Sequence, residues 1–281
     1  MSVVSVRGLV RKYDDRLAVD HLDLNVEAGE CLAMLGPNGA GKTTTVEILE
    51  GYRRRDAGDV SVLGVDPATA SKKWRQRIGI VLQDASDLGE ARVREALRHF
   101  SHFYDHPRSV QEVAELVGLD EQLDQKIGTL SGGQRRRLDV ALGVVGRPEL
   151  LFLDEPTTGF DPEARHVFWG LVERLKTEGV TIVLTTHYLE EADTLADRVV
   201  VIAKGRKVAD ATTEELGGRN SDLATVRWLE GGTTQSERTS TPAIAVGRLS
   251  ARFGGEVPGL EVVRMTLEQA YLSLLERQED Q

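Results

Sequence analysis

A glycine-rich run that ends in a lysine and a threonine lies near the start of the chain. Glycines allow backbone N–H groups to converge on phosphate oxygens at the positive end of a following helix. Lys42 would reach the β and γ phosphates, and the Thr43 hydroxyl would coordinate magnesium. We therefore expect ATP and Mg²⁺ to bind on this run and ATP to be hydrolysed there. The expected nucleotide contacts are Gly36, Pro37, Asn38, Gly39, Ala40, Gly41, Lys42, Thr43 and Thr44.

An apolar run that ends in two carboxylates supplies the second half of the predicted site. Residues 150–153 are apolar, and Asp154 and Glu155 follow directly. The end of a strand in an α/β sheet is where such sheets bind their ligands. Asp154 can hold magnesium, directly or through its water, while Glu155 can polarise the water that attacks the γ phosphate. An acid pair alone is usually a solvated strand end, but the phosphate-binding run favours the catalytic interpretation.

A second glycine-rich turn lies between these two features and begins with a serine. A serine and two glycines that open a helix form another anion-binding terminus. The residues of this turn are Ser131, Gly132, Gly133 and Gln134, after Leu130. With this turn the sequence resembles the ABC ATPases over about residues 3–215. The resemblance implies that the turn contacts the γ phosphate held by a second subunit, and hence a homodimer with two ATP molecules at its interface.

The same resemblance implies roles for four further residues. Tyr13 stands where the family has the aromatic that stacks on adenine, although an aromatic at a strand edge is the alternative. Gln83 corresponds to the glutamine that senses magnesium and water and signals to the membrane partner. Asp161, after Gly159 and Phe160, belongs to the loop that crosses to the other subunit. His187 matches the histidine that contacts the γ phosphate.

The surrounding pattern predicts an α/β protein that positions these residues. Strand signals cover residues 3–13, 18–27, 30–35, 60–63, 78–83, 150–154, 181–185 and 198–202, and helix-like segments cover 93–104, 109–117 and 131–145. The resemblance implies a P-loop NTPase core with an N-terminal antiparallel β subdomain, an inserted helical subdomain and a small α+β C-terminal module. The predicted domains are 1–86 and 149–220 for the ATP-binding core, 87–148 for the helical signature subdomain and 221–281 for the C-terminal module.

Composition limits the classes of partner. The chain has 281 residues, 40% of them hydrophobic, and a net charge of −10. This charge argues against broad nucleic-acid binding, which needs a surplus of basic residues, and no nucleic-acid partner is expected. The apolar runs fall short of the roughly 20 residues that cross a bilayer, and no secretory signal is evident, so a cytoplasmic protein is expected. The single cysteine, Cys31, is expected to be buried in a strand.

Finer features resemble one branch of the family. Residues 51–67 and 134–139 look like the drug-resistance exporters, and residues 266–272 resemble the last helix of ATPase subunits that serve a separate ABC-2 type permease. The resemblance implies an exporter of drugs or other hydrophobic compounds, with the chain peripheral on the inner face of the cell membrane. Two alternatives are a soluble ABC ATPase that acts on nucleic acid or ribosomes and a nucleotide-sensing clamp without catalysis. The sequence does not identify the transported substrate.

Overall fold

The computed structural model describes residues 2–81, 88–216 and 224–279, and the chain forms two compact units. The first unit is Met1–Val208 and the second is Ala209–Gln281. The second unit thus begins at residue 209, whereas the sequence analysis placed the C-terminal module at 221–281. The structure does not test the division of the first unit into a core and a helical subdomain, which stays a prediction. In the described residues, no helix is both long and apolar enough to cross a membrane.

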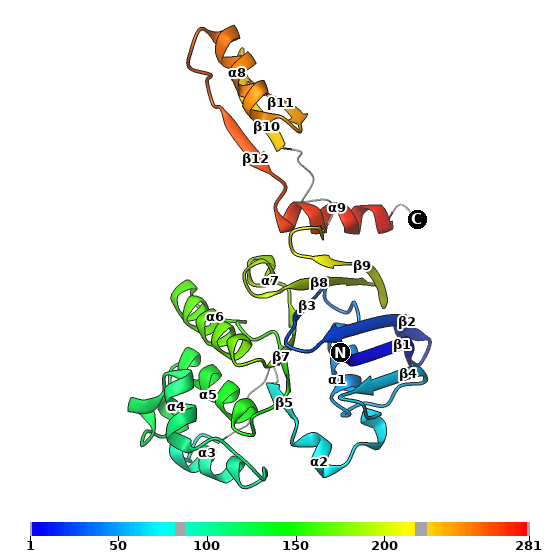
Figure 1. Cartoon of the computed structure of the whole chain (residues 1–281), viewed down its shortest axis with the longest axis vertical. Coiled ribbons are helices and arrows are strands. Elements are labelled where there is room, and N and C mark those ends of the chain that lie inside the picture. Colours follow the sequence, from blue (N-terminus) through cyan, green and yellow to red (C-terminus); the bar gives the residue numbers. More distant parts are fainter. Residues whose placement is uncertain (1, 82–87, 217–223, 280–281) are drawn as a thin grey trace. The chain divides into compact units, whose positions relative to one another are not determined.

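A six-stranded sheet forms the centre of the first unit (Figure 1). Its strand order is β5-β6-β7-β3-β8-β9, and the pairs β5–β6, β6–β7, β7–β3 and β3–β8 are parallel. The apolar sequences of the central strands suit burial on both faces of such a sheet. The strands are β3 (Cys31–Leu35), β5 (Ile78–Val81), β6 (Leu150–Asp154), β7 (Thr181–Thr186), β8 (Arg198–Ala203) and β9 (Arg206–Thr212).

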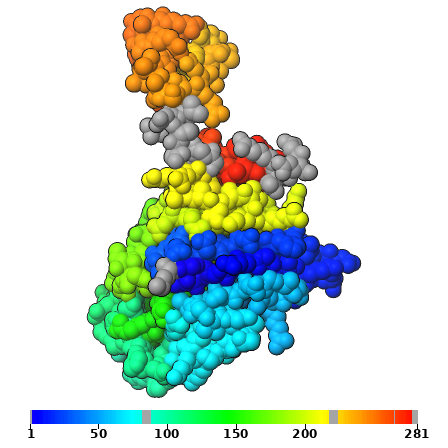
Figure 2. Space-filling model, turned by 45° about the vertical axis from the view of Figure 1, so that its right-hand side comes forward, coloured from blue at the N-terminus to red at the C-terminus, as the bar shows by residue number. Residues whose placement is uncertain are grey.

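A three-stranded antiparallel sheet lies beside it, with strand order β2-β1-β4. These strands are β1 (Ser2–Tyr13), β2 (Arg16–Glu27) and β4 (Ala57–Val62). Buried and exposed residues alternate along β2, as expected for a sheet with one face on the core. The N-terminal strands, drawn in blue, lie on the surface beside the cyan segment that contains β4 (Figure 2). Their apolar side chains join a core cluster with Met34, Phe152 and Val183 of the central sheet.

Helices connect and cover the strands. Helix α1 (Lys42–Leu49) follows β3, and the stretch from residue 88 to 149 contains α helices and 3-10 turns but no strand among the described residues. The three helices predicted there are present, with shorter bounds. The remaining helices of the first unit are α2 (Lys72–Arg75), α3 (Val93–Ser101), α4 (Val110–Val117), α5 (Gly132–Val144), α6 (Pro162–Thr177) and α7 (Leu189–Leu195), with 3-10 turns at Pro67–Thr69, Asp120–Gln122 and Ile127–Thr129.

The second unit contains a small antiparallel sheet and two helices. Strand β10 (Ala224–Glu230) lies between β11 (Thr233–Thr239) and β12 (Glu261–Arg264), and helix α8 (Pro242–Phe253) packs on the sheet through Ala245 and Leu249. Helix α9 (Leu267–Glu279) follows. A capping box begins this helix, because Thr266 and Gln269 each accept a hydrogen bond from the backbone N–H of the other.

Candidate functional site

The glycine-rich loop connects the end of β3 to the start of α1, and two of its glycines are required by close packing. A Cβ atom on Gly36 would lie 2.2 Å from the carbonyl oxygen of Ile202. A Cβ atom on Gly41 would lie 2.3 Å from the carbonyl oxygen of Ala18, and Gly41 has a φ of +106°. A side chain at either position would therefore clash with backbone. These contacts hold the loop against β8 and β2, with helix α1 directly behind it.

Lys42 begins α1, and its side chain folds back over the loop. The residue is only 5% exposed, and its ammonium donates hydrogen bonds to the carbonyl oxygens of Gly36 at 2.7 Å and Pro37 at 3.2 Å. Burial lowers the pKa of the ammonium, and the nearby carboxylates of Glu155 and Asp154 oppose that shift. A buried cation on an open loop is a strong attractor for an anion such as phosphate.

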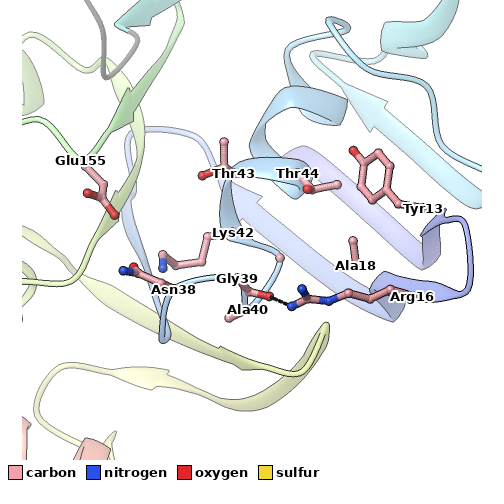
Figure 3. Close-up of a pocket in the computed structure, with 11 residues that line it drawn as sticks. Tyr13, Arg16, Ala18, Asn38, Gly39, Ala40, Lys42, Thr43, Thr44 and Glu155 are labelled. Carbon is pink, nitrogen blue, oxygen red and sulfur yellow. Dashed lines mark hydrogen bonds between the residues drawn. The ribbon is translucent and has the colours of Figure 1, made fainter.

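A pocket of about 560 Å³ extends from this loop. Figure 3 shows that the side chains of Lys42 and Asn38 lie on the side of the loop that faces Glu155, whereas Tyr13 and Thr44 lie on the other. The pocket brings together most of the predicted nucleotide contacts, although Gly36 and Pro37 do not line it. The lining residues are Tyr13, Arg16, Ala18, Asn38, Gly39, Ala40, Gly41, Lys42, Thr43, Thr44 and Glu155.

Two of the lining residues, Arg16 and Ala18, were missed by the sequence analysis. Both lie at the start of β2, and the Arg16 guanidinium donates a hydrogen bond to the carbonyl oxygen of Gly39 at 3.0 Å (Figure 3). Their spacing of three and five residues after Tyr13, across the β1–β2 turn, is the signal that could have identified them.

Tyr13 ends β1 at the far side of the pocket from Glu155. Two guanidinium groups lie over its ring, that of Arg11 at 4.7 Å and that of Arg53 at 5.3 Å from the ring centroid. Arg53 is itself fixed by an ion pair with Glu47, with a shortest N···O distance of 2.5 Å. The ring is therefore held by cation–π contacts at the mouth of the pocket, where it can stack on a planar ligand.

The two predicted carboxylates occupy different environments at the end of β6. Asp154 is 8% exposed and accepts a hydrogen bond from the Thr185 hydroxyl on β7. Burial raises the pKa of Asp154, while the Thr185 hydrogen bond and the positive charge of Lys42 lower it. Glu155 instead lines the pocket, and its main chain adopts a φ of +44°, a left-handed conformation that is uncommon outside glycine.

His187 follows directly after β7 and lies close to Glu155. Its Nδ1 atom is 3.2 Å from the Glu155 carboxylate, to which the Thr158 hydroxyl also donates at 3.3 Å. The imidazole contacts the ring of Tyr188, with the ring centroids 4.1 Å apart. The parallel strands β6 and β7 thus bring Glu155 and His187 together at one edge of the sheet.

The Ser131–Gln134 turn caps α5 and lies outside the pocket that holds Lys42 and Glu155. The Ser131 hydroxyl accepts a hydrogen bond from the Gln134 backbone N–H at 3.2 Å, and the Gln134 side chain accepts one from the Ser131 backbone N–H at 2.9 Å. This turn lines a separate pocket of about 190 Å³. The described residues of that pocket are Ser131, Gly133, Gln134, Arg137, Asp161, Glu163, Ala164 and Val167.

The last two predicted residues have different outcomes. Asp161 caps α6 by accepting a hydrogen bond from the Ala164 backbone N–H at 2.8 Å, and it lines the same pocket as Ser131. Phe160, beside it, packs edge-on against the buried ring of Phe168. Gln83 lies outside the described residues. The roles assigned to the individual site residues stay predictions.

The fold and the pocket define a P-loop ATPase cassette, and comparisons with known proteins agree. A family model for the ABC transporter matches residues 19–158. The chain is 42% identical over 223 residues to the Nod factor export ATP-binding protein I of Burkholderia orbicola, covering 77% of this chain and 73% of that protein. It is 45% identical over 218 residues to the daunorubicin/doxorubicin resistance ATP-binding protein DrrA of Streptomyces peucetius, covering 76% of this chain and 66% of that protein.

Solved structures show the same fold. An ATP-binding subunit of an ABC transporter matches with a TM-score of 0.72 and 22% identity, covering 97% of this chain and 99% of that one. A dimeric post-hydrolysis state of the cassette MJ0796, bound to ADP and Pi, matches with a TM-score of 0.67 and 21% identity, covering 74% of this chain and 98% of that one. The chain belongs to the ABC transporter family, as an ATP-binding cassette that hydrolyses ATP.

Proposed function

We propose that two copies of this chain pair head to tail around two ATP molecules and power a separate ABC-2 type permease. The observation that carries the proposal is the separation of two phosphate-binding turns. Lys42 and Glu155 line one pocket, whereas Ser131 and Gly133 line another. A second copy can supply the Ser131 turn to the γ phosphate, and the dimeric MJ0796 cassette has the same fold. Each nucleotide would then lie between Lys42 of one copy and Ser131 of the other.

The roles of the side chains follow from their positions in the pocket. Lys42 would exchange its carbonyl partners for the β and γ phosphates, and Tyr13 would stack on the adenine. Glu155 would orient the attacking water and accept its proton, because its carboxylate lines the pocket close to the loop. His187, within 3.2 Å of that carboxylate, would hold it in place and contact the γ phosphate. The other copy's Ser131 turn would neutralise charge on the same phosphate.

The residues present fit a magnesium ion. Magnesium prefers oxygen ligands. The Thr43 hydroxyl at the start of α1 and the Asp154 carboxylate at the end of β6 are both oxygen donors. The excess of acidic charge from Asp154 and Glu155 beside a single buried lysine also favours a cation. Thr43 and Asp154 would hold the ion, which would supply positive charge to offset that of the phosphates. Gln83 is the third proposed ligand.

Binding of ATP would favour the closed pair because only that pair contacts both sides of the γ phosphate. Hydrolysis and loss of phosphate would remove the shared ligand and release the two copies. This cycle would drive the permease between two access states. The names of the two relatives, a Nod factor export protein and a daunorubicin/doxorubicin resistance protein, support an exporter, with drugs or other hydrophobic compounds as cargo. The chain would work at the inner face of the membrane.

Glu155→Gln tests the catalytic part of the proposal. The variant should bind ATP as the wild type does, lose turnover by about 10³-fold, and form a dimer that persists in ATP. Size-exclusion chromatography with and without ATP, together with phosphate release, measures both properties. Glu121→Gln, at an exposed position far from the pocket, is the matched control and should behave as the wild type. Normal phosphate release by Glu155→Gln would show that another residue is the base.

Co-purification tests the membrane partner. Expression of the full chain together with the neighbouring reading frames, followed by affinity capture from detergent-solubilised membranes, should recover an integral membrane protein with about six spanning segments. Recovery of the chain with ribosomes or DNA, and without such a protein, would contradict the transport proposal.

A further inference from the structure

Three consecutive arginines follow the Ser131 turn along α5, and each donates hydrogen bonds to the backbone of a different segment. Arg135 contacts the carbonyl oxygen of Ile127 at 2.9 Å, and Arg137 contacts that of Gly118 at 2.8 Å. Both of these bonds stay within the helical stretch between β5 and β6. Arg136 instead leaves this stretch and contacts the end of β6, where the catalytic carboxylate is attached.

The Arg136 guanidinium binds the main chain on both sides of Glu155. Its Nε donates to the carbonyl oxygen of Pro156 at 2.9 Å, and its Nη2 donates to that of Asp154 at 2.9 Å. The side chain is buried, with 7% of the residue exposed. A planar guanidinium offers its donors in a fixed fork, so this contact constrains both the distance and the relative orientation of the two carbonyls.

The constraint acts on a residue whose backbone is strained. Glu155 has a φ of +44°, in the left-handed region that residues with a side chain seldom adopt. Such a conformation persists only where the surrounding structure holds it. The Glu155 backbone N–H donates to the Thr185 carbonyl oxygen at 3.0 Å on one side, and Arg136 holds the two flanking carbonyls on the other. These two contacts therefore help to set the direction in which the Glu155 side chain leaves the main chain, and Thr158 and His187 contact the carboxylate itself.

We propose that Arg136 is a positioning residue for ATP hydrolysis, which holds the strained backbone of Glu155 so that its carboxylate faces the attacking water. This inference rests on the proposed role of Glu155 as the base. Arg136 is not among the described residues that line the nucleotide pocket or the Ser131 pocket, and its two hydrogen bonds to the β6 end are made to main-chain carbonyls.

The position of Arg136 also connects the two phosphate-binding turns of one copy. Ser131 caps α5 and Arg136 follows five residues later, about 7 Å along the helix axis. In the proposed pair the Ser131 turn contacts the nucleotide of the partner, while Glu155 acts on the copy's own nucleotide. A displacement of α5 on closure of one site would thus reach the catalytic carboxylate of the other site through a single side chain.

A purely structural role is the competing explanation, because Arg136 is buried and lies 3.9 Å from the Asp139 carboxylate. Burial raises the pKa of Asp139 to about 6, and the positive charge of Arg136 opposes this shift. Loss of the arginine could then unfold the region. A structural role predicts a lower stability with a normal kcat for the folded fraction, whereas a positioning role predicts a lower kcat with an unchanged KM.

The experiment compares Arg136→Met and Arg136→Lys in the full chain. The methionine keeps the aliphatic stem and removes both hydrogen bonds, and the lysine keeps the charge but has one point donor in place of the fork. Arg174→Met is a control for the loss of an arginine–carbonyl hydrogen bond elsewhere, because the exposed Arg174 donates to the carbonyl oxygen of Leu116 at 3.0 Å and lines neither pocket. Phosphate release per folded molecule, KM for ATP, thermal unfolding and ATP-dependent dimerisation in the Glu155→Gln background are measured for each.

We expect Arg136→Met to lower kcat by about 10- to 100-fold and Arg136→Lys by about 3- to 10-fold, since a small misplacement of a catalytic group costs this much. KM should change less than about threefold, and ATP-dependent dimerisation in the Glu155→Gln background should be retained. A kcat within twofold of wild type for both variants, or a loss of dimerisation with an unchanged kcat, would overturn the inference. Failure of Glu155→Gln alone to stop turnover would instead overturn the proposed function, so the two results are distinguishable.

Discussion

The loop at residues 36–43 and the turn at residues 131–134 are both glycine-rich and both precede a helix, yet they provide different sites. The first follows a buried central strand, contains the buried Lys42 and borders a pocket of about 560 Å³. The second caps α5 with Ser131, contains no cation and borders a pocket of about 190 Å³. A helix start is therefore not sufficient to hold a nucleotide. The first turn differs from the second in the buried strand that precedes it and in the buried charge of Lys42, and we expect these two features to let it hold a nucleotide by itself.

The charged residues around the two turns also differ. In the first pocket Lys42 lies within a field that includes Glu155 and Asp154, which suits a nucleotide accompanied by a cation. The second pocket has Arg137 as its basic residue but also the acids Asp161 and Glu163. Partial cancellation of charge leaves this turn a weak anion site by itself. We expect it to bind a phosphate only when the first site of another copy presents one.

The largest expected effect comes from removing the buried charge of the first site. Lys42→Ala should weaken ATP binding by more than about 10-fold and lower turnover by about 10³-fold, because Lys42 is the one lysine among the described residues that line the pocket. Isothermal titration calorimetry and phosphate release measure the two losses. Lys72→Ala, at an exposed position on α2, is the control and should keep both properties. An unchanged affinity in Lys42→Ala would remove the main distinction between the two turns.

A negative charge on the second turn should separate binding from catalysis. A Cβ atom at Gly133 would meet only the Cβ atom of Ala164, at 3.5 Å, which is an ordinary contact. Gly133→Asp should therefore fold, bind ATP within about threefold of wild type, and lose turnover by about 10²-fold through repulsion of the partner's γ phosphate. Gly133→Ala should lose much less. The comparison between the two turns fails if Gly133→Asp abolishes ATP binding to the isolated subunit.

Removal of the proposed adenine contact should have a smaller effect, on affinity. Tyr13→Ala should raise KM for ATP by about 10-fold with little change in kcat, since stacking stabilises the ground state and the transition state alike. Tyr13→Phe keeps the ring that Arg11 and Arg53 contact and should stay close to wild type. Steady-state kinetics over a range of ATP concentrations checks both variants. Equal KM values for ATP in Tyr13→Ala and wild type would show that adenine does not stack on Tyr13.

The smallest effect concerns a buried ionisable group on or directly after the helix behind each turn. Arg136 on α5 has carbonyl partners, whereas burial raises the pKa of Glu50 at the end of α1 from 4.5 to about 8. Below pH 4.5 this carboxyl is protonated in both the folded and unfolded states. Between pH 4.5 and 8 only the unfolded state releases the proton, so the stability of the folded state falls as the pH rises.

Glu50→Gln removes this loss of stability. The variant should unfold about 2–6 °C higher than wild type at pH 8, and the difference should shrink toward zero near pH 5. Thermal unfolding followed by circular dichroism across this pH range measures it. A constant difference at all pH values would indicate a packing effect in place of titration.

Much of the site was predictable because its chemistry demands particular residue types in a local order. The loop around Lys42, the Asp154–Glu155 pair and the Ser131 turn each need specific residues within a few positions, so each is visible in the sequence. Arg16 and Arg136 were not predicted, since each acts through main-chain carbonyls of a segment that is distant in sequence. Single arginines carry no local signal of such contacts.

In the fold too, features set by local sequence were predicted, whereas features set by distant contacts were not. The buried apolar strands β3, β6 and β7 were predicted within a residue or two, because continuous apolar runs bounded by turns have few alternatives. The second unit begins at Ala209, earlier than the predicted 221, within strand β9. That strand contains neither glycine nor proline, so no turn residue marks the boundary there. A boundary set by long-range contacts is not encoded at one position.

The internal hydrogen bonds of the two glycine-rich turns have a consequence for phosphate binding. The Lys42 ammonium is bonded to Gly36 and Pro37, and the Ser131 and Gln134 backbone N–H groups are bonded within their own capping box. A phosphate that binds at either turn must therefore compete with these internal acceptors for the donors.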